Sequence, residues 1–117
     1  MLSRIDRLLL ATPDAEGAAA LWRSRLDAAE VGRDRVGGLG ARRIALRVGT
    51  SDIELLEPDG AGVVADELAR RGRAHLLAAG AMADNVDALA ATAAQAGATC
   101  ARADGRLYVT LTLEGAP

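Results

Sequence analysis

The stretch "SDIELLEPDG", residues 51 to 60, has the pattern of a strand that ends in a turn. Ile53 and Leu55 alternate with Glu54 and Leu56, so the first pair points to one face of a sheet and the second pair to the other. A proline and a glycine then end the strand. A carboxylate that shares a face with a leucine is unusual, because acidic side chains are rarely buried without a partner.

The residues before this stretch predict a strand, a helix and two further strands. Residues 4–11 are mostly apolar and are followed by a turn sequence. A helix is expected next, with Thr12 as its cap, a proline at its first position, and alanines and Trp22 repeating at helical spacing toward the core. Strands are then expected over residues 28–36 and 41–48, with a glycine-rich turn between them.

The residues after this stretch repeat the same order of elements. A helical turn or two is expected within 65–73, a strand over 74–83, and a helix over 84–97 that is capped at its start and closed by a glycine. Two strand candidates follow, at 98–103 and 106–114. Because neither half can bury a sheet face alone, the halves should pair into one curved mixed sheet with helices outside. The predicted fold class is α+β, built from paired βαβββ modules.

Length and composition limit the organisation of the chain. The 117 residues are enough for one domain and too few for two independent cores. The expected organisation is a single domain over 1–117, with module one at about 3–60, a linker at about 61–73, and a shortened module two at about 74–114.

Charge and cysteine content exclude several classes of protein. Fourteen arginines against sixteen acidic residues give a net charge of -2, which offers no basic footprint for nucleic acid. The apolar run near the amino terminus is too short for a signal peptide or a membrane span. A single cysteine, Cys100, cannot form an intramolecular disulfide and fits a reducing cytoplasm, so a cytoplasmic protein without membrane contact is expected.

Three segments together resemble a known family. They are "IDRLLLATPDAEGAAALWRSRL" at 5–26, "VGGLGARRIALRVG" at 36–49 and "DIELLEP" at 52–58. They look like the first module of the vicinal oxygen chelate superfamily, which includes glyoxalase I, methylmalonyl-CoA epimerase, extradiol dioxygenases and bleomycin-resistance proteins. The match is strong over 3–60 and weaker over 74–114, and is most like the epimerase and glyoxalase branches. The resemblance implies a cleft between paired modules and a homodimer.

The resemblance also implies a role for Glu54. In metal-using relatives the matching strand contributes a Glu or Gln to a divalent metal ion. The other ligand positions fall on Arg7 and Ala78, which cannot bind a cation, and loosely on Glu114. His75, the only histidine, lies three residues before the expected position and should point to the opposite face of its strand. The metal site is therefore expected to be incomplete.

Arginine can take the place of the metal ion. If the two family positions still face each other, the guanidinium of Arg7 lies near Glu54 and neutralises it. Arg43 and Arg47 share one face of their strand, which gives a cationic cleft for a carboxylate or phosphate, or else a solvated sheet face. Tyr108, near the last strands, is a further candidate for contact with a ligand.

Three functions remain open on this basis. The first is a metal-free protein that binds a small, anionic molecule, either holding it or catalysing isomerisation or lyase chemistry with Glu54 as base and Arg7 as electrostatic partner. The second is a metal-dependent epimerase or lactoylglutathione-lyase-type enzyme whose missing ligands come from His75, Glu114 or a partner chain. The third is a non-catalytic dimer subunit. Only the second needs a divalent metal ion as cofactor.

Overall fold

The computed structural model describes residues 2–103 and 105–110. The chain forms two compact units. The N-terminal unit spans Arg4–Ala81, and the C-terminal unit spans Met82–Pro117 together with Met1–Ser3. Helices and strands are mixed in the order expected from the sequence, which confirms the α+β class and the βαβββ module. No helix among the described residues has the length and apolarity needed to span a membrane.

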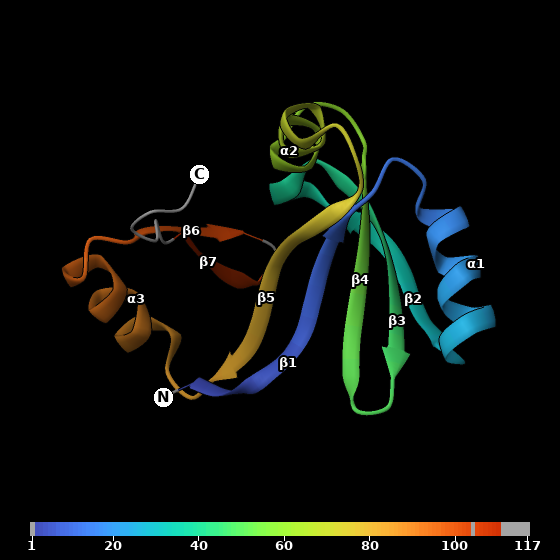
Figure 1. Ribbon diagram of the computed structural model, residues 1–117. Coiled ribbons are helices and arrows are strands. Elements are labelled where there is room, and N and C mark those ends of the chain that lie inside the picture. Colours follow the sequence, from blue (N-terminus) through green and yellow to red (C-terminus); the bar gives the residue numbers. More distant parts are fainter. Residues whose placement is uncertain (1, 104, 111–117) are drawn as a thin grey trace. The chain divides into compact units, whose positions relative to one another are not determined.

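The N-terminal unit contains the first module, the following helix and most of the next strand (Figure 1). Its elements are β1 (Leu2–Ala11), α1 (Ala15–Leu26), β2 (Ala29–Val36), a short 3-10 turn (Gly37–Leu39), β3 (Ala41–Val48), β4 (Ser51–Pro58), α2 (Val63–Arg71) and β5 (His75–Ala83). The predicted strands and helices are all present, and α2 lies within the segment expected to link the modules.

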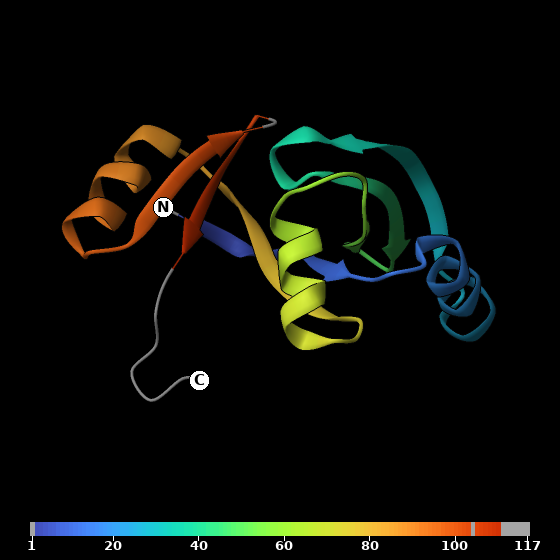
Figure 2. The ribbon, with the colours of Figure 1, turned by 90° about the horizontal axis from the view of Figure 1, so that it is seen from above.

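The five strands of this unit form one mixed sheet. Their order is β2-β3-β4-β1-β5, with β1 parallel to β4 and β3 antiparallel to both of its neighbours. The strand that opens the second module therefore joins the sheet of the first, and it runs antiparallel to β1 (Figure 1). The helix α1 covers one face of the sheet, whereas α2 packs against β4 near the end at which β5 begins (Figure 2).

Alternation along the strands separates the two faces of this sheet. On the α1 face, Ile44, Leu46, Ile53 and Leu55 are buried against Ala19 and other small residues of the helix. Small helical side chains let α1 approach the sheet closely, so a core with almost no aromatic residues can still exclude water. The opposite face carries the side chain of Glu54, and we call it the Glu54 face.

The start of α1 differs from the prediction. Asp14, not Thr12, is the cap, because its Oδ1 accepts a hydrogen bond from the backbone N–H of Gly17 at 3.0 Å. The Thr12 hydroxyl oxygen instead accepts the N–H of Asp14 at 3.1 Å. Trp22 packs against the α1-side core, as its helical spacing predicted.

The C-terminal unit contains α3 (Val86–Gln95) and an antiparallel pair of strands, β6 (Thr99–Ala103) and β7 (Arg106–Thr110). Asn85 caps α3 by accepting the N–H of Ala88 at 3.0 Å. Two strands follow α3 among the described residues, and they form a separate two-stranded sheet. Residues 111–114, the end of the last predicted strand, lie outside the described residues. The helix packs on both strands but has no buried residue of its own.

Candidate functional site

The charged residues of the Glu54 face lie in three rows across the sheet. The strand register defines these rows. The first row contains Arg7, Asp52 and Arg47, and the second contains Leu9, Glu54 and Ala45. The third row contains Ala11, Leu56, Arg43 and Asp34. Glu54 is therefore in an apolar row between two rows that contain arginine. Only 4% of its surface is exposed.

Arg43 is a partner of Glu54. Its Nη1 donates to Oε1 of Glu54 at 3.2 Å, from the neighbouring strand and the next row. The rest of the guanidinium is held by Asp34, which accepts from Nε at 2.7 Å and from Nη2 at 2.5 Å. The hydrogen bonds of Asp34, and next the charge of Glu54, raise the pKa of Arg43, although burial opposes them. The cation is thus fixed between two carboxylates of β2 and β4.

Arg7 lies on the same face, on the strand next to Glu54. It is directly opposite Asp52, and Leu9 is opposite Glu54, so Arg7 and Glu54 are one row apart on neighbouring strands. The Nε of Arg7 donates to Oδ1 of Asp6 at 3.0 Å, and this hydrogen bond lowers the pKa of Asp6. The predicted pairing of Arg7 with Glu54 stays a prediction, whereas the contact from Arg43 is one that the sequence did not assign.

The two remaining ligand candidates lie in different units. Arg47 is on the Glu54 face, and its Nε and Nη2 donate to Asp52 at 2.8 and 3.3 Å. Tyr108 is on β7 of the C-terminal unit, opposite Ala101, and is half-buried.

The charges on the Glu54 face balance. Arg7, Arg43 and Arg47 share it with Asp34, Asp52 and Glu54, and Arg43 and Arg47 each bind a carboxylate. The sequence left two interpretations open for the arginines of β3, a cationic cleft or a solvated sheet face, because their acidic neighbours come from other strands. Positive charge alone therefore does not select an anionic ligand on this face.

The described residues do not fit the metal site that the resemblance implies. His75 borders an apolar cavity of about 230 Å³ together with Leu10 and Trp22 of the α1 side. Its Nδ1 lies 2.9 Å from the carbonyl oxygen of Arg73. Glu114 lies outside the described residues. Within 2–103 and 105–110, no group of three or more His, Cys, Asp and Glu side chains could hold a metal ion.

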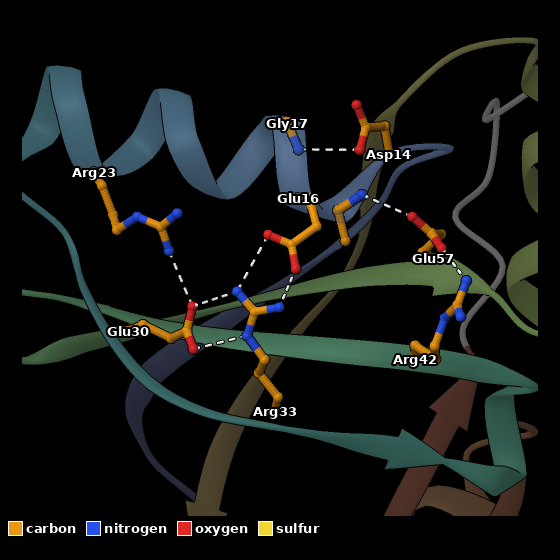
Figure 3. Close-up of polar contacts among 9 residues, drawn as sticks. Asp14, Glu16, Gly17, Arg23, Glu30, Arg33, Arg42 and Glu57 are labelled. Carbon is orange, nitrogen blue, oxygen red and sulfur yellow. Dashed lines mark hydrogen bonds and ion pairs between the residues drawn. The ribbon is translucent and has the colours of Figure 1, made fainter.

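A second polar cluster joins α1 to β2 on the opposite face of the sheet (Figure 3). Arg33 of β2 binds the carboxylates of both Glu16 and Glu30, and Arg23 donates to Glu30 at 2.9 Å. The hydrogen bonds from Arg33 lower the pKa of Glu16 and of Glu30. These side chains are partly exposed and paired with one another, so the cluster fastens the helix to the edge of the sheet.

Glu57 holds the beginning of α1 from the end of β4 (Figure 3). Its Oε1 accepts the backbone N–H of Ala15 at 3.0 Å, and its Oε2 accepts from Arg42 at 2.5 Å. The signal for the contact was its shared face with Ile53 and Leu55, which is the face that α1 covers.

Comparisons with known proteins find a match in structure but not in sequence. No family model and no curated protein sequence matches the chain. The solved structure of methylmalonyl-CoA epimerase from Mycobacterium tuberculosis is similar over 86% of this chain and 69% of that chain, with a TM-score of 0.78 and 20% identity. A Streptomyces coelicolor methylmalonyl-CoA epimerase in complex with 2-nitronate-propionyl-CoA covers 86% of this chain and 74% of that chain, with a TM-score of 0.77 and 24% identity.

A third similar structure is a hypothetical protein from Bacillus halodurans, with a TM-score of 0.74 and 18% identity over 85% of this chain and 72% of that chain. At these identities the likeness establishes the fold. The resemblance inferred from the sequence is thus confirmed at that level, and the chain has the fold of the vicinal oxygen chelate superfamily, in the form found in methylmalonyl-CoA epimerases.

Proposed function

We propose that the Glu54 face binds a small molecule through its oxygen atoms without a metal ion. The observation that supports this most directly is the buried carboxylate of Glu54 with the Nη1 of Arg43 at 3.2 Å. In metal-using relatives a carboxylate at this position faces a cation, and here an arginine side chain supplies the positive charge. A guanidinium also has several N–H donors in a fixed plane, which suits a carbonyl or carboxylate oxygen of a ligand.

The same arrangement suits isomerisation of a carbonyl compound. Glu54 would accept a proton from the carbon next to the carbonyl group, and the C–H electron pair would move into an enolate. Arg7, one row away on β1, would stabilise the negative charge on the enolate oxygen. Protonation of the opposite face of the carbon would complete an epimerisation, whereas return of the proton to the original face would regenerate the substrate. Arg43 and Arg47 remain the candidates for binding the rest of the ligand.

A metal-dependent epimerase is the second candidate function. The similarity to methylmalonyl-CoA epimerases favours it, and one of these structures is in complex with methylmalonyl-CoA. It requires ligands beyond Glu54, from Glu114 or from the second copy in a homodimer. A dimer subunit without catalysis is the third candidate.

Thermal unfolding with added ions and ligands separates these functions. We expect EDTA, Zn²⁺, Ni²⁺ and Mn²⁺ to leave the midpoint unchanged, and a member of a panel of small carboxylates and acyl thioesters, including methylmalonyl-CoA, to raise it. A ligand at 100 times its Kd adds about 2.7 kcal/mol of stability. Arg43→Met should abolish the shift. Arg35→Met is the control, because Arg35 forms an exposed ion pair with Asp59 away from this face.

The opposite outcome is equally clear. Stabilisation by one transition ion that disappears in Glu54→Gln would contradict the metal-free proposal and support the second candidate. Catalysis is tested by exchange of the ligand's α-hydrogen for deuterium in heavy water, followed by NMR. Binding without exchange, in the wild type and in Glu54→Gln alike, would leave a binding protein and exclude the isomerase.

A further inference from the structure

At position 80 of β5 there is no room for a side chain larger than that of glycine. The φ angle of Gly80 lies outside the left-handed region, so the backbone there does not require glycine. A Cβ atom at this position would lie 2.6 Å from Cγ and 2.7 Å from Cδ of Arg7, and 3.3 Å from its Nε. Non-bonded carbon atoms do not approach to these distances. The stem of the Arg7 side chain therefore occupies the volume that a side chain at position 80 would fill.

This close approach is specific to one strand glycine. Gly32 of β2 also has a φ angle outside the left-handed region, and a Cβ atom there would meet nothing within 4 Å. Both glycines lie in outer strands of the same sheet. The difference between them is the arginine that crosses Gly80, which makes Gly32 a matched control.

The contact places Arg7 between two elements. The side chain starts on β1 and lies over Gly80 on the adjacent strand β5, and its Nε reaches Asp6 at 3.0 Å. Only 22% of the side chain is exposed. A flexible side chain that is packed along its stem and bound at Nε has few rotamers left, so its guanidinium is held in one place.

We propose that Gly80 is a positioning residue for Arg7, an inference that rests on the proposed role of Arg7 beside Glu54. The family position on β5 that would carry a metal-binding histidine corresponds to Ala78. Two residues further along β5 is Gly80, which has no side chain, so the side chain of Arg7 can occupy that volume. The strand β5 thus provides the space that the stem of Arg7 occupies, and any larger residue at position 80 displaces the Arg7 side chain.

The test is Gly80→Ala compared with Gly32→Ala. The Nε–H signal of Arg7 in a nitrogen-proton NMR spectrum, assigned by its loss in Arg7→Lys, reports the position of the guanidinium directly. We expect this signal to shift in Gly80→Ala and to stay unchanged in Gly32→Ala. Gly80→Ala should also lower the midpoint of thermal unfolding by about 5 °C, as overpacking by a methyl group does in a small domain.

The double variant Arg7→Ala/Gly80→Ala tests the cause and guards against a single variant that does not fold. With the arginine stem removed, the added methyl group has room, so Gly80→Ala should then change the midpoint by less than about 2 °C. The inference would be overturned if Gly80→Ala lowered the thermal midpoint equally in the wild type and in Arg7→Ala. An unshifted Arg7 Nε–H signal in Gly80→Ala would overturn it as well.

These measurements need no ligand, so they remain decisive even if the proposed function fails. Where the wild type does bind a carboxylate or thioester from the panel, Gly80→Ala should weaken its Kd about tenfold, the effect of misplacing one charge-assisted hydrogen bond. Normal binding with a displaced Arg7 signal would contradict the role of Arg7 in the function while leaving its positioning by Gly80 intact.

Discussion

At the scale of single residues, the environment of Glu54 explains how an acidic side chain lies inside an apolar strand. Arg43 donates to Glu54 at 3.2 Å and, with its other nitrogens, to Asp34. The two carboxylates differ in environment, since the side chain of Glu54 is 6% exposed and that of Asp34 is 51% exposed. Loss of the inner contact should therefore cost more than loss of the outer one.

Arg43→Met should lower the free energy of unfolding by about 2 kcal/mol, because it removes a charged donor from a buried carboxylate. Asp34→Asn removes only the exposed partner and should cost less than about 1 kcal/mol. Urea denaturation of both variants measures the difference. Equal costs would show that the burial of Glu54 does not set the strength of this interaction.

Acid should loosen the Arg33 cluster. Arg33 lowers the pKa of Glu16 and Glu30 from their usual 4.5, so both carboxylates add stability above that pH and lose it as the pH falls through their lower folded values. We expect the thermal midpoint to decline between roughly pH 5 and pH 3, and less steeply in Arg33→Gln. Arg25→Gln is the control, because Arg25, on the helix that carries Glu16, forms no ion pair with a described residue. An unchanged slope in Arg33→Gln would contradict this prediction.

At the scale of elements, α1 is held at its start by two carboxylates from different parts of the chain. Asp14 accepts the N–H of Gly17, and Glu57, 42 residues after Ala15, accepts the N–H of Ala15. The first N–H groups of a helix have no partner within the helix, so each contact satisfies a donor that would otherwise be exposed to competition from water.

Asp14→Ala and Glu57→Ala should each lower the free energy of unfolding by about 1 kcal/mol. Asp66→Ala, which removes an exposed acid from the first turn of α2, should cost about half as much because only the helix dipole is affected. Urea denaturation gives the three values. A negligible cost for Glu57→Ala would mean that its contact with Ala15 adds nothing beyond the cap of Asp14.

The elements could be predicted from sequence, but the contacts between them could not. Periodicity of two along β3 and β4 and helical spacing around Trp22 depend on neighbouring residues, which is why those elements are where they were expected. The carboxylates that bind Arg43 and Arg47 lie on other strands or beyond a turn, so finding them requires the register of the sheet. The register is also needed to see that Arg7 and Glu54 lie in adjacent rows on neighbouring strands, and hence to recognise the candidate site.

At the scale of the molecule, the two units differ in how much of their surface is buried. Every buried apolar residue among the described ones lies between Leu9 and Val64, within the N-terminal unit. In the C-terminal unit, α3 has no buried residue and packs on only two strands. The internal repeat was readable from the sequence, but this inequality was not, because the alanines of α3 resemble those of α1 that are buried.

Hydrogen exchange should therefore be faster in the C-terminal unit. Amides of α3, β6 and β7 should exchange through local opening, whereas those of β3 and β4 should require global unfolding, because little apolar surface resists opening in the former. Mass spectrometry of peptides from the two units measures the rates. Equal protection in both would show that the repeat unfolds as one cooperative body.

The scarcity of aromatic residues has a practical consequence. The chain has one tryptophan, one tyrosine and no phenylalanine, and Trp22 falls in the N-terminal unit while Tyr108 falls in the C-terminal unit. Each half of the repeat thus carries a single intrinsic chromophore. Fluorescence excited at the red edge of absorption comes from Trp22 alone and reports unfolding of the N-terminal unit. The near-ultraviolet signal of Tyr108 reports unfolding of the C-terminal unit. The order in which the two units unfold can therefore be followed optically without a label.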